Sequence, residues 1–336
     1  MRAEQSIAVI GAGSWGTALA ILLAGNNQQV NLWGWDDDQL KIMHKQRCNH
    51  RYLPYIPFPD SLNVCFDAKS TLEDVNDILI AVPAIGVKET LQQLKPFIHE
   101  KTRVVLASKG LEQNNLQLLH EVVQSEFGVE VPICILSGPT FAIEVARGLP
   151  TAVTIASYDE YYAQEFSAYL QNDVFRVYTS SDVIGVEIGG LVKNVMAIAA
   201  GTADGMGFGA NTRAALITRG LHEMTQLGMK LGGKAETFMG LAGLGDLVLT
   251  CTDDKSRNRR VGLGLAEGKS IDDILDELGQ VAEGVYTAKN VYLLTKQLKL
   301  EMPIVDQVYE VLYNNKSPVK AVEDLLNRVP RAEVNS

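Results

Sequence analysis

A glycine-rich hexapeptide near the N-terminus has the residue types and the spacing that bind a pyrophosphate. It reads Gly11-Ala12-Gly13-Ser14-Trp15-Gly16. In such a pattern Gly11 permits a tight turn, Gly13 lets the backbone approach an anion, and Gly16 lets a helix pack closely on a strand. Backbone N–H groups and the positive end of the helix dipole then bind the anion without a cationic side chain. The hexapeptide therefore predicts a dinucleotide site.

A single charged residue interrupts a long apolar segment in the second half of the chain. Lys193 is the one charged residue between Ile188 and Ala203, and Asn194 follows it. A lysine removed from water has a lowered pKa and can exchange a proton near neutral pH. The alternative is a lysine that extends from an apolar helix to solvent. Because its neighbours are apolar or small, we favour proton transfer by Lys193.

An acid follows a second glycine-rich segment. Asp246 comes directly after Gly240-Leu241-Ala242-Gly243-Leu244-Gly245. It can cap a helix, or it can pair with Lys193 in a proton relay. The residues alone leave both interpretations open.

The segment 253–260 contains four cations, a hydroxyl group and an amide group. Guanidinium groups such as that of Arg257 bind phosphate through two parallel hydrogen bonds, and Ser256 and Asn258 can add further contacts. The segment therefore predicts an oxyanion site. A solvated basic helix end is the alternative, and nucleic-acid binding is disfavoured because aromatic residues are not interleaved with the cations.

These groups have to be positioned by alternating strands and helices in the first half of the chain. The hexapeptide lies between an expected strand, 6–10, and an expected helix, 17–25. Further apolar segments predict strands at residues 30–33, 77–83, 103–107, 132–136, 151–156 and 174–178. This alternation predicts an α/β fold with a Rossmann-type, doubly wound parallel sheet, in which ligands bind beyond the carboxyl ends of the strands.

Three residues follow the carboxyl ends of expected strands. Lys109 comes after 103–107, whereas Gly138 and Thr140 come after 132–136. A cation at Lys109 can bind phosphate, Gly138 allows close backbone approach, and Thr140 offers a hydroxyl group at a helix start. A solvated Lys109 and a plain helix cap at Thr140 are the alternatives.

The second expected strand leads into Trp35 and then Asp36, twenty positions after Gly16. An acid there usually accepts the adenosine ribose 2′-hydroxyl and disfavours the 2′-phosphate of NADP. Asp36 can equally cap the helix that starts near Gln39.

Composition limits the function classes further. The chain has 336 residues with 46% hydrophobic and 21% charged residues, and a formal net charge of −10. Such a chain suits two globular domains, which we place at 1–180 and 181–336, the second entirely α-helical. The negative charge disfavours nucleic-acid binding, and no apolar run near the N-terminus is long enough for membrane insertion. The four cysteines and five histidines lack metal-ligand spacing, so we expect no metal site.

Across nearly its whole length the chain resembles bacterial NAD(P)-dependent glycerol-3-phosphate dehydrogenases. The motifs that carry the resemblance are Gly11 to Ala18, Lys109-Gly110, Ser137 to Ala142, Val192-Lys193-Asn194, Gly243 to Leu247 and Ser256-Arg257-Asn258. Several ordered motifs are more specific than any one of them. The resemblance implies reversible hydride transfer between NAD(P)H and dihydroxyacetone phosphate, which yields sn-glycerol 3-phosphate for phospholipid synthesis. It also implies a cytoplasmic enzyme that forms a homodimer.

The resemblance implies a role for particular residues. Lys193 would be the proton donor and acceptor. The implied substrate contacts are Lys109, Gly138, Thr140, Lys193, Asp246, Ser256, Arg257 and Asn258. The expected cofactor contacts combine those that the resemblance implies with those that the hexapeptide and the strand ends indicate. They are Gly11, Gly13, Ser14, Trp15, Gly16, Trp35, Lys109, Ala142, Arg257, Val281 and Glu283.

The chain departs from many relatives at Trp35, where they place Arg or His. Trp35 can stack on adenine but cannot pair with a 2′-phosphate, so we expect a weaker preference for NADP than in those relatives. Two other functions fit part of the pattern. Another β-hydroxyacid dehydrogenase would select a carboxylate substrate, and a non-catalytic NAD(P)-sensing regulator would bind the cofactor without oxidising it.

Overall fold

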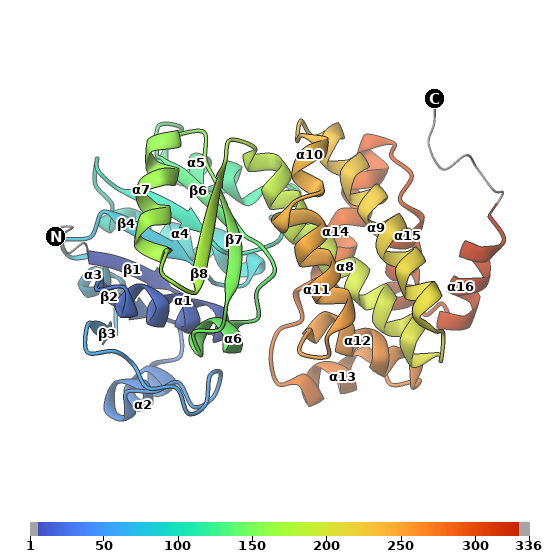
Figure 1. Cartoon of the computed structure of the whole chain (residues 1–336), viewed down its shortest axis with the longest axis horizontal. Helices are drawn as coiled ribbons and strands as arrows, with labels where there is room; N and C mark the ends of the chain where they lie inside the picture. The colour runs from blue at the N-terminus through green and yellow to red at the C-terminus, as the bar shows by residue number, and fades with distance from the viewer. Residues whose placement is uncertain (1–5, 329–336) are drawn as a thin grey trace. The chain divides into compact units, whose positions relative to one another are not determined.

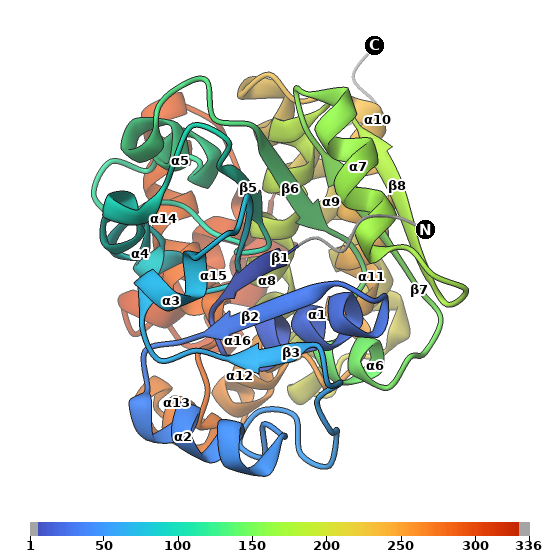
Figure 2. The same cartoon turned by 90° about the vertical axis from the view of Figure 1, so that its left-hand side faces the viewer.

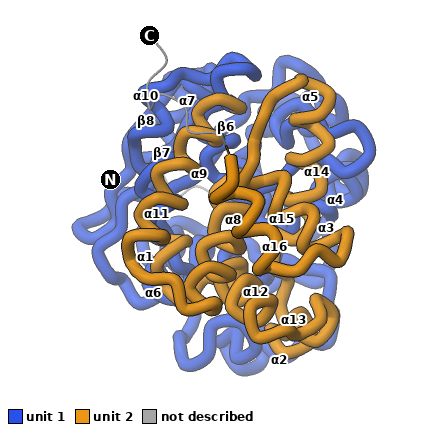
Figure 3. The backbone as a smooth tube through the Cα atoms, turned by 90° about the vertical axis from the view of Figure 1, so that its right-hand side faces the viewer, with its two compact units in different colours: residues 1–191, 228–249 blue, residues 192–227, 250–336 orange. Residues whose placement is uncertain are grey.

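A computed structural model describes residues 6–328 and divides into two compact units. Residues 1–191 and 228–249 form the first unit, and residues 192–227 and 250–336 form the second (Figure 3). The division falls inside one long helix, α8 (Val183–Gly205), directly after Leu191. The domain boundary that we expect between residues 180 and 181 stays a prediction. The two compact units are divided differently, since the start of α8 and residues 228–249 belong to the first unit.

The first unit contains an eight-stranded sheet (Figure 1). Its strands are β1 (Ser6–Ile10), β2 (Gln29–Trp33), β3 (Leu62–Val64), β4 (Asp77–Ile80), β5 (Arg103–Leu106), β6 (Ile133–Ser137), β7 (Thr151–Ala156) and β8 (Phe175–Ser180). Their order is β3-β2-β1-β4-β5-β6-β7-β8, which Figure 2 shows from β3 at one edge to β8 at the other. The first six strands have the order of a Rossmann fold, as expected.

Two features of the sheet differ from the expectation. β7 pairs antiparallel with β6, so the sheet is mixed rather than wholly parallel. The connection between them contains one short helix, α6 (Ala142–Ala146), and β7 returns in the opposite direction. β3 was not expected, because three residues are too few to show a strand pattern.

Three helices of the first unit begin at an acidic side chain that caps them. Asp36, Asp67 and Asp159 each accept a hydrogen bond from a backbone N–H three residues later. The helices are α1 (Ser14–Gly25), α2 (Asp37–Gln46), α3 (Ala68–Leu72), α4 (Val87–Leu94), α5 (Leu119–Phe127), α6, α7 (Glu160–Leu170) and α10 (Ala235–Phe238), with the short turns η1 (Ala84–Gly86), η2 (Lys95–Phe97) and the π-helical η3 (Leu241–Gly245). α11 (Asp246–Thr252) runs across the boundary into the second unit.

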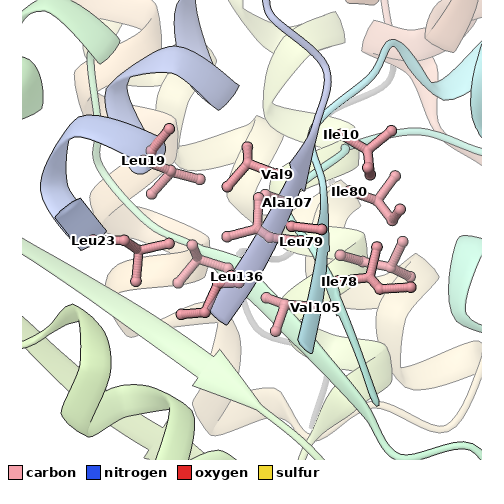
Figure 4. Packing of buried hydrophobic residues seen from close by; sticks show 14 of the residues in the cluster. Val9, Ile10, Leu19, Leu23, Ile78, Leu79, Ile80, Val105, Ala107 and Leu136 are labelled. Carbon is pink, nitrogen blue, oxygen red and sulfur yellow. The ribbon is translucent and has the colours of Figure 1, made fainter. Parts of the chain in front are cut away.

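The core of the first unit lies on both faces of the sheet. Val9 and Ile10 of β1 are fully buried, and so are their partners in β4. Adjacent residues of a strand point to opposite faces, so a strand covered on both sides is apolar throughout. Figure 4 shows Leu19 and Leu23 of α1 on the face that carries Val9, with Ile10 and Ile80 on the other. This packing holds α1 and its N-terminus against β1.

The described part of the second unit consists of helices. They are the remainder of α8, α9 (Ala210–Lys230), α12 (Arg257–Ala266), α13 (Ile271–Leu278), α14 (Glu283–Leu298), α15 (Pro303–Tyr313) and α16 (Pro318–Leu326). By length and composition α8 could cross a membrane, yet 89% of its apolar window is buried within the molecule. Such burial is typical of a core helix.

A buried acid holds two helices of the second unit together. The carboxyl oxygens of Glu223 on α9 accept hydrogen bonds from the N–H groups of Ile304, at 2.8 Å, and Val305, at 3.3 Å, in the first turn of α15. Burial raises the pKa of the Glu223 carboxyl to about 8, against the opposing effect of the two N–H donors. The folded state therefore keeps a proton that the unfolded chain releases near its ordinary pKa of 4.5.

We expect this acid to make stability depend on pH. Because its folded pKa is raised, its contribution is complete below the unfolded pKa and is lost as the pH rises through about 8. Relative to Glu223→Gln, the free energy of unfolding should fall by up to about 1.4 kcal/mol per pH unit between those values. Urea unfolding of both proteins from pH 5 to 8 measures the difference, and parallel curves would contradict the prediction.

Candidate functional site: a dinucleotide cradle and a buried lysine–carboxylate pair

The glycine hexapeptide forms a tight connection between β1 and α1. Gly11 has φ of +117°, and a Cβ atom there would lie 2.7 Å from the carbonyl carbon of Ala81. A Cβ atom on Gly16 would lie 1.9 Å from the carbonyl oxygen of Gly11. Both positions therefore require glycine, the first for its conformation and the second for the close packing of α1 on β1.

The same loop, residues 11–16, is called the glycine cradle below, and it leaves room for an anion at the start of α1. Gly13 is the N-terminal cap of α1, and a Cβ atom on it would meet no heavy atom within 4 Å. No side chain caps this helix, and its first turn contains no acid. The indole N–H of Trp15 is buried without a hydrogen-bond partner among the described residues. Free space, helix N–H groups and an unused donor fit the pyrophosphate of a dinucleotide.

The loop after β2 presents both a carboxylate and an aromatic ring. Asp36 caps α2, because its Oδ1 accepts from the N–H of Gln39 at 3.0 Å, so the capping interpretation is confirmed. Its Oδ2 accepts from Arg51 Nη1 at 3.1 Å. Trp35 is 47% exposed, and its ring lies beside that of Trp33 with centroids 4.9 Å apart. This places an open aromatic surface at the end of β2.

Lys109 and Asp246, both in the first unit, form an ion pair. The Nζ of Lys109 lies 2.7 Å from Oδ2 of Asp246, and the carboxylate is fully buried. The lysine stem passes over α8, where a Cβ atom on Gly190 would lie 3.2 Å from its Cδ. The alternative of a solvated Lys109 is therefore wrong. Lys193 belongs to the second unit, so its predicted pairing with Asp246 stays a prediction.

The turn after β6 is built as the strand-end pattern predicts. Gly138 has φ of +148°, and a Cβ atom on it would lie 2.9 Å from Cα of Val153. The hydroxyl group of Thr140 donates to the carbonyl of Gly138 at 3.2 Å. Phe141, not Thr140, is the N-terminal cap of α6, which begins at Ala142. The capping alternative for Thr140 is therefore wrong.

In the second unit, the starts of α12 and α14 meet the middle of α8. Lys193 is only 6% exposed there. The side-chain amide of Asn258 donates to Oδ1 of Asn194 at 2.9 Å, and its own Oδ1 accepts from the N–H of Gly284 at 2.8 Å. Asn258 thus fixes the residue that follows Lys193 and also the first turn of α14, which begins with Glu283.

The basic segment 253–260 is only partly available to an anion. Ser256 caps α12, since its hydroxyl group accepts from the N–H of Arg259 at 3.2 Å. Arg259 itself is buried and pairs with Asp204 and with Asp254, the latter at 2.8 Å. Lys255 pairs with Asp253 at 3.0 Å. Arg259 and Lys255 are thus engaged by acidic side chains, and the oxyanion site predicted for this segment stays a prediction.

Arg257 remains in a position suited to a ligand. Its Nη1 donates to Oε1 of Gln280 at 3.3 Å. Val281, the residue after Gln280, is 39% exposed, and Glu283 follows two residues later. The predicted contacts Arg257, Val281 and Glu283 therefore come from neighbouring segments of the second unit.

Two structural residues were missed by sequence reasoning. Asn49 is fully buried and donates to the carbonyl of Ala12 at 2.9 Å and to the hydroxyl group of Thr17 at 2.8 Å. Asp204 binds both Arg259 and Arg213. Neither residue stands in a recognisable motif, although a polar residue such as Asp204 near the end of the apolar helix α8 is itself a weak signal.

Comparisons with known proteins agree with this arrangement. Residues 6–163 match the family model of the NAD-dependent glycerol-3-phosphate dehydrogenase N-terminus, and residues 182–323 match that of its C-terminus. The chain is 50% identical to a glycerol-3-phosphate dehydrogenase [NAD(P)+] of Idiomarina loihiensis over 97% of this chain and 98% of that protein. It is 53% identical to one from Nitrosococcus oceani, over 97% of this chain and 94% of that protein.

A solved structure supports the same relationship. The glycerol-3-phosphate dehydrogenase of Coxiella burnetii is 48% identical to this chain and superimposes with a TM-score of 0.94, covering 97% of this chain and 99% of that one. The fold order, the glycine cradle and two family matches that together span most of the chain all agree. The chain therefore belongs to the family of NAD-dependent glycerol-3-phosphate dehydrogenases.

Proposed function

We propose that this chain catalyses the reversible, NAD(P)H-dependent reduction of dihydroxyacetone phosphate to sn-glycerol 3-phosphate. The observation that carries the proposal is the Lys109–Asp246 pair, at 2.7 Å, in the same unit as the glycine cradle. Lys109 follows β5, so it lies at the carboxyl edge of the sheet where Rossmann folds bind their ligands. A cation held at that edge by a fully buried carboxylate suits a phosphorylated substrate beside a dinucleotide.

The cofactor would be held mainly by backbone groups. The glycine cradle is formed by Gly11, Gly13 and Gly16. The backbone N–H groups of Ser14 and Trp15 lie in the first turn of α1 and would donate to the pyrophosphate. Trp35 would stack on the adenine ring. Lys109, Ala142, Arg257, Val281 and Glu283 complete the proposed contacts. When bound, NAD(P)H supplies the hydride that reduces the substrate carbonyl carbon.

Lys193 would supply the proton that the carbonyl oxygen takes up. Lys193 is buried, at 6% exposure, so few water molecules compete with the substrate for it. Asn194, fixed by Asn258, would help to orient the substrate. Lys193 returns to the protonated state by exchange with solvent between turnovers, so proton and hydride are both accounted for.

The phosphate of the substrate would be bound remote from the reacting carbon. We assign that role to Arg257 together with Ser256 and Asn258, with Lys109, Gly138, Thr140 and Asp246 as the further contacts. Binding energy from the phosphate then serves to orient the carbonyl group. We also propose that residues 1–180 bind the cofactor, that 181–336 bind substrate, and that the enzyme is a cytoplasmic homodimer which supplies phospholipid synthesis.

A spectrophotometric assay tests the reaction directly. We expect NADH absorbance to fall on addition of dihydroxyacetone phosphate, but not on addition of oxaloacetate or 6-phosphogluconate. Oxaloacetate tests for a carboxylate-specific dehydrogenase, and 6-phosphogluconate tests whether any phosphorylated sugar acid is accepted. Cofactor binding without oxidation in the presence of dihydroxyacetone phosphate would instead identify a regulator and contradict the proposal.

A further inference from the structure

We infer that Arg51 is a binding residue for the 2′-phosphate of NADP(H), and that it supplies the cation that Trp35 does not. The inference rests on the proposed cofactor function and specifies the form of the cofactor. It depends on where the fold places a residue that lies fifteen positions beyond Asp36 in the sequence. No motif points to Arg51.

The segment that carries Arg51 is bound to the glycine cradle. Asn49 donates from its side chain to Ala12 at 2.9 Å and to Thr17 at 2.8 Å, and its Oδ1 accepts from the N–H of Tyr52 at 3.2 Å. The carbonyl of Tyr52 accepts from the hydroxyl group of Ser14 at 3.3 Å. Arg51 therefore sits on a turn whose flanking residues contact the pyrophosphate loop on both sides.

The side chain of Arg51 extends to the end of β2. Its Nη1 lies 3.1 Å from Oδ2 of Asp36, the acid at the position that usually accepts the adenosine ribose hydroxyl group. The guanidinium group also lies over the ring of Tyr52, with Cζ 5.2 Å from the centroid. A group on the ribose 2′-oxygen would be directed to this carboxylate and this guanidinium.

The charges at this point suit an exchange of partners. Both side chains of the Arg51–Asp36 pair are about half exposed, at 57% and 49%, and such a pair contributes little stability because solvent screens it. A guanidinium group can donate two parallel hydrogen bonds to either ligand, but it is attracted more strongly to the phosphate, which carries almost twice the negative charge of a carboxylate. Arg51 can therefore stay with Asp36 when NADH is bound and turn to the 2′-phosphate when NADPH is bound.

This arrangement changes the expectation drawn from Trp35. Asp36, Asp37 and Asp38 by themselves would repel a 2′-phosphate. Lys41 contacts Asp38, at 3.0 Å, whereas Arg51 contacts Asp36 itself. Arg51 supplies the opposing charge from another part of the chain, so the absence of Arg or His at position 35 does not remove NADP binding. The chain should accept both cofactors.

Calorimetric titration with NADH, NADPH and 2′,5′-ADP tests the inference by binding alone. We expect Arg51→Ala to raise the Kd of NADPH and of 2′,5′-ADP by about tenfold to a hundredfold. The Kd of NADH should change by less than about threefold, because its ribose has no phosphate to lose a partner. Arg51→Lys keeps the charge but cannot donate two parallel hydrogen bonds to the phosphate. We expect it to raise the Kd of NADPH by an intermediate factor.

Lys41→Ala is the matched control, since it removes one exposed cation from the same region. We expect it to leave all three affinities within about threefold of the wild type. Equal losses for NADH and NADPH in Arg51→Ala would show a merely structural role and overturn the inference, as would no loss at all. A wild-type chain that binds neither NADH nor NADPH would instead contradict the proposed function.

Discussion

Replacing Lys193 by Met is expected to lower kcat by about a hundredfold to ten-thousandfold, the range usual for loss of a general acid. Lys193 is buried, and Met has a similar length without the charge, so α8 should keep its packing. The Kd for NADH should stay within about twofold of the wild type, because no contact with the cofactor is assigned to this residue. Steady-state kinetics and calorimetric titration measure the two quantities.

Two further observations separate a proton donor from a structural lysine. The pH dependence of kcat should differ between the wild type and the residual activity of the Met variant, because the variant lacks the proposed proton donor. Lys230→Met, at an exposed position of α9, is the matched control and should behave as the wild type. Unchanged turnover in Lys193→Met would remove the assignment.

Replacing Gly13 by Ala is expected to weaken NADH binding by about tenfold to a hundredfold, because a methyl group would occupy the space that a pyrophosphate needs. The fold should survive. Gly13 has φ of −78°, which any residue adopts, and its Cβ atom would meet nothing within 4 Å. Thermal unfolding should therefore be unchanged while the Kd rises.

Two neighbouring glycines make this test specific. Gly25→Ala, at the other end of α1, also meets nothing within 4 Å and should leave both binding and stability close to the wild type. Gly16→Ala should instead destabilise the fold, since its Cβ atom would lie 1.9 Å from the carbonyl oxygen of Gly11. Normal NADH affinity in Gly13→Ala would show that the cradle does not bind the pyrophosphate.

Much of the architecture could be predicted because it depends on local patterns. The central strands, such as β1 and β4, are buried on both faces, so each is a short apolar run that can be predicted from the sequence. The more exposed β8 was also predicted, and β3 alone among the described strands was not. The turn between β1 and α1 could be predicted from the hexapeptide alone. Gly16 is required there because a Cβ atom on it would clash with the carbonyl oxygen of Gly11, which is in the same hexapeptide. α8 could be recognised because Lys193 is the one charged residue in its long segment from Ile188 to Ala203.

Other features depend on which segments meet in space. The direction of β7 follows from the path of the connection after β6, and the apolar pattern of β7 is the same for either direction. Arg257 and Arg259 are two residues apart and chemically alike. Arg259 nevertheless forms an ion pair with Asp204, which lies 55 residues away in the sequence. A charge pattern predicts that cations are present, but the partner of each is decided by tertiary contacts.

The sequence was thus sufficient for the elements and for the kind of chemistry, since backbone conformation, burial and residue type are encoded within short windows. Only the folded chain decided which polar groups remain available for ligands. It paired Lys109 with Asp246 across 137 positions and Arg51 with Asp36 across 15. Those pairings require long-range contacts that no local pattern specifies, and the second of them is the basis of the NADPH contact that we propose for Arg51.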